Sequence, residues 1–255
     1  MKIGFKKAMK LAQIALMLTV MCSGVLYAEK NENTDIVVPD TVLIDIPTAG
    51  ILDYYGFLIK NRFSNDGTIV GHLNFGVMER LNLGASMRIE KFIGSDAGMK
   101  IVRPEIQVKF RSFDGGYYTP ALAVGYDGQG NFYDKNLKKY MEKGRGLFVV
   151  GSKEFGMPNM VFHGGLNISD FDDNYVFGFL GMNYTLEDQV SFIFEYDNFF
   201  HEGDPSRFNI GTRFYITPYF QLDVALREIG ESDVFINGAK RKSERIVQMS
   251  YTTSF

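Results

Sequence analysis

The chain has 255 residues, of which 45% are hydrophobic and 22% are charged, with a net charge of −3 and one cysteine, Cys22. This slightly acidic balance argues against nucleic acid as a partner, because phosphate binding needs a basic surface. No apolar run reaches the roughly 20 residues of a transmembrane helix. The composition fits either a soluble β domain or a membrane β-barrel, whose membrane signal is spread over short alternating strands.

The first 28 residues have the pattern of a signal peptide. Four lysines within the first ten residues precede an apolar run, Leu11 to Val20, and small residues follow up to Ala28. A membrane anchor is the alternative, but the apolar run is too short to cross a bilayer. Cleavage after Ala28 would remove four lysines, leaving 23 basic and 30 acidic residues and a net charge of −7. The mature chain then has no cysteine for a disulfide, a thiol nucleophile or a metal site.

Residues 29–49 are polar and acidic at first and then extended and apolar. We expect them to form an N-terminal periplasmic arm that precedes the folded domain. The end of this arm either stays in the periplasm or enters the lumen of that domain.

From residue 50 to residue 255 the chain shows period-two alternation of apolar and polar residues. The range 102–111 shows it best, since every second residue is apolar and the residues between are charged or polar. Such alternation gives a strand with one apolar and one polar face. It predicts an all-β protein, a transmembrane up-and-down antiparallel β-barrel of about 12 strands. The predicted strands are 51–63, 68–78, 81–93, 102–112, 118–127, 145–154, 160–170, 174–185, 189–198, 206–216, 220–229 and 244–255.

The predicted connections are alternately short and long, as in bacterial outer-membrane barrels. With an even number of strands, the start of the first strand and the end of the last strand both lie on the side of the short turns. The last strand ends with the outward aromatics Tyr251 and Phe255, an insertion signal that barrel-assembly machinery would recognise. We therefore expect a monomer in the outer membrane of a Gram-negative-type bacterium, in contact with lipid and lipopolysaccharide.

If the apolar faces point to lipid, many charged side chains point into the lumen. These cations either pair with the acids and close the lumen, or attract small anionic solutes such as acidic sugars. The predicted lumen-lining residues are Lys60, Arg62, Arg88, Glu90, Arg103, Glu105, Lys109, Arg111, Lys153, Glu195, Asp197, Arg207, Arg213, Asp223 and Arg227.

The sequence contains little that indicates a catalytic, cofactor-binding or metal-binding site. His163 shares its predicted face with Asn167 and Ser169. Such same-face neighbours arise by chance in any strand of this composition, so we expect a histidine in a lumenal polar network and not a catalytic base. We expect no catalytic residue, no cofactor and no metal site. In the longest loop, 128–144, the stretch "NLKKYMEKG" predicts one amphipathic turn that folds into the barrel mouth or stands outside it.

The stretch "DIPTAGILDYYGF", Asp45 to Phe57, resembles the opening "P-T/S-A-G" segment of YjbH-like outer-membrane proteins. "FGVMERLNLGAS" and the ending "ERIVQMSYTTSF" are similar to small, largely uncharacterised barrels with this opening. The resemblance implies a role in exopolysaccharide production and export, and it brings no catalytic residues. The chain is much shorter than full YjbH-like proteins.

Together these features predict a narrow outer-membrane channel or a surface and envelope assembly factor, linked through the resemblance to exopolysaccharide export. Two alternatives stay open. One is an outer-membrane hydrolase, which would need a serine and a histidine close together on the outward face, and the predicted strands do not supply such a pair. The other is a soluble periplasmic β-sheet binding protein.

Overall fold

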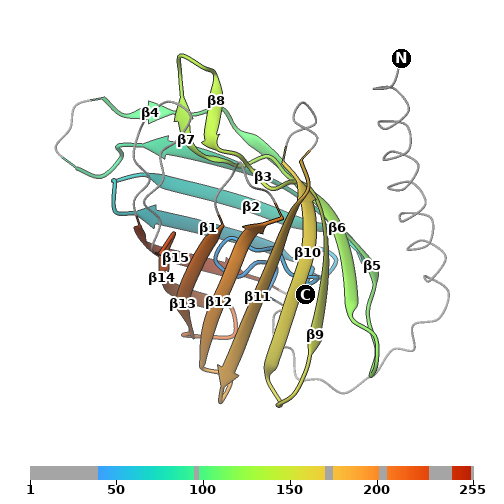
Figure 1. Ribbon diagram of the computed structural model, residues 1–255. Coiled ribbons are helices and arrows are strands. Elements are labelled where there is room, and N and C mark those ends of the chain that lie inside the picture. The colour runs from blue at the N-terminus through green and yellow to red at the C-terminus, as the bar shows by residue number, and fades with distance from the viewer. Residues whose placement is uncertain (1–39, 95–97, 170–174, 201–205, 230–242, 254–255) are drawn as a thin grey trace, which may run out of the picture.

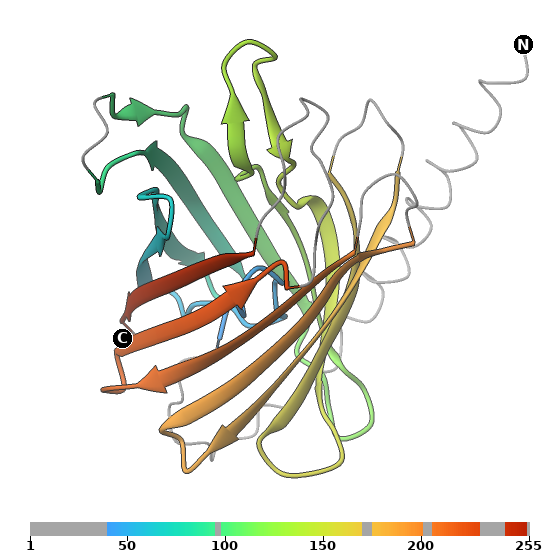
Figure 2. The same ribbon diagram turned by 60° about the vertical axis from the view of Figure 1, so that its left-hand side comes forward.

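The computed structural model describes residues 40–94, 98–169, 175–200, 206–229 and 243–253. All regular elements in these ranges are β-strands, and none of the described residues forms a helix long and apolar enough to cross a membrane. Twelve strands pair antiparallel around a closed ring. Figures 1 and 2 show the barrel from two sides. The prediction of an all-β antiparallel barrel is confirmed.

Each wall strand pairs with the wall strands that come before and after it in the sequence, and β1 pairs with the last strand, with Leu58 opposite Thr252. The observed strands lie close to the predicted ones, but the first begins at residue 57 and not at 51. The wall strands are β1 (Phe57–Ser64), β2 (Ile69–Met78), β3 (Leu81–Glu90), β5 (Glu105–Phe113), β6 (Ala121–Asp127), β9 (Gly146–Glu154), β10 (Met160–Ile168), β11 (Phe177–Leu186), β12 (Val190–Phe199), β13 (Arg207–Tyr215), β14 (Phe220–Arg227) and β15 (Glu244–Thr252).

The two ends of the barrel differ. One end, here called the turn end, carries the short connections such as 79–80 and 187–189, together with the start of β1 and the end of β15. The opposite loop end carries β4 (Lys100–Ile101), which pairs antiparallel with the last two residues of β3, and the hairpin of β7 (Asn131–Asp134) and β8 (Lys139–Glu142). The expected amphipathic turn at "NLKKYMEKG" is wrong, because this stretch contributes β8 to a two-stranded hairpin.

The wall alternates between an apolar outer face and a more polar inner face. In β12, Phe192, Phe194 and Tyr196 are 40–45% exposed on the outside. Their neighbours Glu195 and Asp197 are buried inside. Of the predicted insertion signal, Tyr251 lies on the outer face of β15, and Phe255 lies outside the described residues.

The interior is filled by the segment that precedes β1. Residues 40–52 run inside the barrel, where Leu43, Ile44 and Ile46 are fully buried (blue trace in Figure 2). This is the second of the two positions considered for the end of the arm. Residues 29–39, also predicted to be periplasmic, lie outside the described residues.

The alternation makes the outer face sensitive to charge. We expect Leu180→Arg, on the outer face within β11, to destabilise the protein in a bilayer by about 2–4 kcal/mol. Leu186→Arg is the matched control, because it lies on the same face near the turn end, where the cost falls to about 0–1 kcal/mol. Urea titration of the refolded protein in vesicles measures both. Equal costs at the two positions would contradict the assignment of this face to lipid.

Candidate functional site: the lumen and its arm hairpin

Residues 40–50 fold back on themselves inside the lumen, and we call them the arm hairpin. The Leu43 N–H donates to the Ile46 carbonyl oxygen at 2.9 Å, and Val42 and Pro47 form an isolated β-bridge. The tip of the turn is therefore at Asp45. The "P-T-A-G" stretch singled out in the sequence forms the returning limb of this hairpin.

A single carboxylate holds the tip of the arm hairpin. Glu195 Oε1 accepts hydrogen bonds from the N–H groups of Ile44 (2.7 Å), Asp45 (2.9 Å) and Ile46 (3.0 Å). Glu195 Oε2 accepts a further bond from Asn209 Nδ2 at 2.8 Å. Buried N–H groups without a partner are costly, so this carboxylate lets the turn exist away from water.

The Asp45 side chain is clamped between two arginines of the wall. Its carboxylate lies 2.8 Å from Arg62 Nη1 and 2.6 Å from Arg227 Nε. Burial by itself raises the pKa of Asp45, but Arg227 and Arg62 outweigh this effect and hold the pKa below its ordinary value. The Asp45 carbonyl oxygen accepts a bond from Arg145 Nη2 at 3.1 Å. The tip is thus an anion held by three cations.

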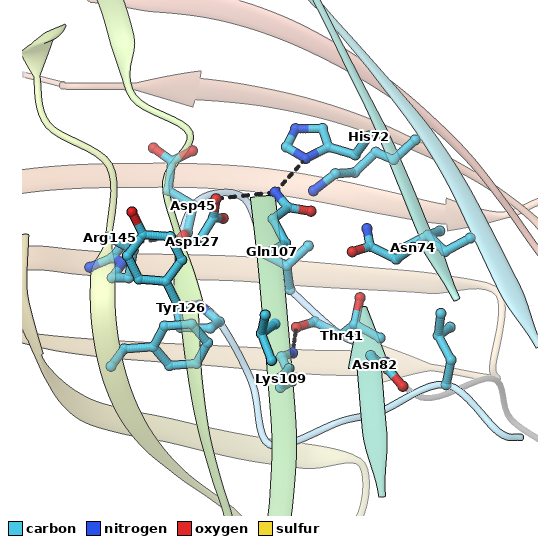
Figure 3. A pocket seen from close by; sticks show the side chains of 17 residues that line it. Thr41, Asp45, His72, Asn74, Asn82, Gln107, Lys109, Tyr126, Asp127 and Arg145 are labelled. Atoms are coloured by element: carbon cyan, nitrogen blue, oxygen red, sulfur yellow. Dashed lines mark hydrogen bonds between the residues drawn. The ribbon is translucent and has the colours of Figure 1, made fainter. Parts of the chain in front are cut away.

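The base of the arm hairpin is held by a lysine. Lys109 Nζ donates to the carbonyl oxygens of Thr41, of Thr48 at 3.2 Å and of Gly50 at 3.1 Å, and Figure 3 shows the bond to Thr41. One ammonium group therefore ties both limbs of the hairpin to β5.

The outgoing limb is held in the same way by β13. Arg213 Nη2 donates to the carbonyl oxygens of Val42 and Leu43, each at 3.2 Å. The same guanidinium lies 2.7 Å from the Asp40 carboxylate and 2.8 Å from the Asp223 carboxylate. The cations of the inner wall thus bind the arm backbone as well as acidic side chains.

The apolar side chains of the arm hairpin meet a matching inner surface. A Cβ atom added at Gly181 would lie 2.8 Å from Leu43 Cδ1, and one at Gly211 would lie 3.0 Å from Ile44 Cδ1. Glycine at these two wall positions therefore leaves room for the arm. Two buried clusters join arm and wall: Ile46, Ala49, Ala123, Phe148, Val150 and Phe179 in one, and Leu43, Ile44, Ile193, Ala225 and Ile246 in the other.

The arm hairpin divides the remaining space. Two adjacent cavities of about 80 Å³ each lie along the inner face of β1 and β2, and Lys60, His72 and Asp127 line both. Figure 3 shows Gln107 bonded to His72 and Asp127 in the first of them. A space of this size holds a few water molecules but no sugar. At the turn end there is a larger chamber of about 660 Å³.

The loop end is narrowed by the β7–β8 hairpin. Glu142 of β8 is buried and lies 2.5 Å from Arg207 and 2.9 Å from Arg227. Arg227 also pairs with Glu244 of β15. The base of the longest loop therefore folds into the barrel mouth, the first of the two positions considered for it.

The structure places most of the lining residues named from the sequence on the inner face. Nine of them are buried there: Lys60, Arg62, Arg88, Glu195, Asp197, Arg207, Arg213, Asp223 and Arg227. Glu90, Glu105, Lys109 and Arg111 have the same strand parity and are partly buried.

Two predicted lining residues lie elsewhere. Ser152 faces the lumen, so its neighbour Lys153 points to the outer face, where its Nζ donates to the carbonyl oxygens of the turn at residues 116 and 117. The error arose because β9 is apolar on the inside, where it packs against the arm. Arg103 precedes β5, and its side chain is 64% exposed and paired with Glu105.

His163 belongs to a polar network, but its partners are not the predicted ones. Ser152 Oγ lies 2.7 Å from His163 Nδ1, and Asn183 Oδ1 lies 2.8 Å from His163 Nε2. Asn167 instead donates to the Arg145 carbonyl oxygen and to Ser169. Ser152, His163 and Asn183 come from three adjacent strands, β9, β10 and β11, so only the register of the sheet brings them together.

The geometry predicts that Glu195 controls docking of the arm. Glu195→Ala leaves the N–H groups at the tip without an acceptor, which should weaken docking by about 1–3 kcal/mol. Hydrogen exchange at Ile44–Ile46 should then be faster by roughly 5- to 150-fold. Glu154→Ala is the control, because Glu154 accepts from Asn159 within its own turn. Unchanged exchange at the tip would contradict the role of Glu195.

Comparison with known proteins supports the fold. No family model and no curated protein matches the sequence. Among solved structures, a KdgM porin is similar with a TM-score of 0.51 and 7% identity, covering 78% of this chain and 99% of that one. A NanC porin is similar with a TM-score of 0.43 and 10% identity, covering 78% of this chain and 99% of that one. The likeness to the KdgM porin shows that this chain has a porin-like β-barrel fold.

Proposed function

We propose that the protein is a narrow outer-membrane channel, in a Gram-negative-type bacterium, whose passage is closed by its own arm hairpin. The observation that carries this proposal is that a separate segment, and not the wall, fills the lumen. Opposite the arm the wall presents small residues, such as Gly181, Gly211 and Ala225. Withdrawal of the arm would therefore leave a passage, whereas a barrel filled by its own wall side chains has none.

The apolar outer face supports the membrane location. Large apolar side chains are exposed all around the wall, which in water would be an aggregation hazard. A lipid environment removes that cost. The porin-like fold agrees with this location.

The channel would favour small anions, including acidic sugars once the arm has moved. With the arm docked, most inner arginines are neutralised by acids or bound to arm carbonyls. Lys60 differs, because its ammonium forms no hydrogen bond or ion pair with any residue the structure describes, and it lines both small cavities. Arm withdrawal would add Arg62 and Lys109 to the free cations.

A second candidate is a surface or envelope assembly factor with a role in exopolysaccharide export. The resemblance of Asp45–Phe57 to YjbH-like proteins suggests it, and the close fit of the arm hairpin favours a barrel that stays shut. In this case the loop end of the barrel would be the surface that binds a partner.

Conductance separates the two candidates. In planar bilayers the wild-type protein should show rare, small openings, and Glu195→Ala should open more often because its arm is loosened. Glu154→Ala is the matched control and should behave like the wild-type protein. A silent Glu195→Ala protein, with insertion and faster exchange at the tip both verified, would reject the channel and favour the assembly factor.

Selectivity tests the charge of the passage. Under a salt gradient the open channel should show an anion-selective reversal potential, which Lys60→Gln should shift towards zero, most at low salt where screening is weakest. Lys153→Gln is the matched control, since it removes the same charge from the outer face. Equal shifts in both variants would show that Lys60 does not face the ion path.

A further inference from the structure

The turn-end chamber contains a serine, a histidine and an amide in a chain of hydrogen bonds. Ser152 of β9 is partly exposed to the chamber, whereas His163 of β10 and Asn183 of β11 are buried behind it. The contacts of 2.7 Å and 2.8 Å on the two nitrogens of the histidine ring are the spacing of a nucleophile, a base and an orienting group. Docking of the arm uses only the Ser152 oxygen, as an acceptor for the Ala49 N–H.

The hydrogen-bond directions suit a nucleophilic serine. Asn183 Nδ2 donates to Ser191 Oγ at 3.5 Å, so Asn183 Oδ1 faces His163 and accepts its Nε2–H. His163 Nδ1 then has no proton and accepts the hydroxyl proton of Ser152. The Ala49 N–H donates to Ser152 Oγ at 2.8 Å, which leaves the oxygen one lone pair.

We propose that Ser152, His163 and Asn183 form an esterase site inside the barrel, open to the turn end, for compact acyl esters. The volume of the chamber, about 660 Å³, limits the substrate to a small ester. Its lining combines apolar side chains such as Val161 and Ile216 with polar ones. The chamber lies in the lumen, away from the outer face on which the sequence-based hydrolase alternative had been considered.

The reaction needs only the ester and water. Ser152 Oγ bonds to the ester carbonyl carbon while its proton passes to His163 Nδ1. His163 then protonates the departing alkoxide, the ester C–O bond breaks, and an alcohol leaves. Water attacks the acyl-serine with His163 again as base, the acid is released, and Ser152 regains its proton. The Ala49 N–H is the donor nearest the nucleophile and would turn to the carbonyl oxygen as charge develops there.

Covalent labelling tests this site with the full mature protein in detergent. A fluorophosphonate probe should form one adduct, located on Ser152 by mass spectrometry of peptides, and p-nitrophenyl acetate should be hydrolysed. His163→Gln should slow both reactions by about 100-fold or more. Asn183→Asp should retain more activity than Asn183→Ala, because the carboxylate still orients the ring.

Ser86→Ala is the matched control for Ser152→Ala. Ser86 is also an inner-face serine, but it is buried and donates to Gln129 at 2.9 Å. Ser152→Ala should lose the adduct, and Ser86→Ala should keep it, with heat-modifiable migration on gels showing that both fold. An unlabelled wild-type protein, or an adduct on another serine, would overturn the proposal whatever the variants do. The channel proposal is tested by conductance and the esterase proposal by labelling, so either can fail without the other.

Discussion

The carboxylate of Glu195 is the contact on which the interior of this protein depends. A barrel of twelve strands has a lumen too wide to be closed by short wall side chains and too narrow to admit a folded domain. A tight chain reversal fits into this lumen, but its buried backbone N–H groups need hydrogen-bond acceptors. One buried acid that accepts three successive N–H groups solves this at the tip, and Asp45 then brings the charge that Arg62 and Arg227 require.

The charged side chains of the inner wall have a structural role, because they hold the arm hairpin in the lumen. Lys109, Arg145 and Arg213 donate to arm carbonyl oxygens, so they replace the strand partner that an extended segment inside a barrel lacks. The same groups would be released to solvent or solute if the arm moved. The same side chains therefore close the lumen when the arm is docked and would select anions when it is withdrawn. Lys60 already lines the space that the docked arm leaves.

Much of the wall could be predicted from the sequence, because period-two alternation is a local property and survives in nearly every strand. The interior could not be, because the rule that apolar residues face lipid fails where the arm docks. Phe148, Val150 and Phe179 point inward to meet Ile46, and this misled the assignment of Lys153. The contacts of Glu195 and His163 depend on sheet register and on a segment 150 residues distant, for which alternation carries no signal.

The arm also joins the two activities proposed for the lumen. Ala49 lies on the returning limb of the arm hairpin and gives its N–H to Ser152, whereas Glu195 holds the tip of the same hairpin. Loosening the tip opens the passage and, because both limbs share one turn, also withdraws the donor beside the nucleophile. Pore opening and chemistry at Ser152 should therefore oppose each other. A barrel that is shut by its arm has its Ser152 chamber assembled, and a barrel that conducts has given up one of the groups that this chamber uses.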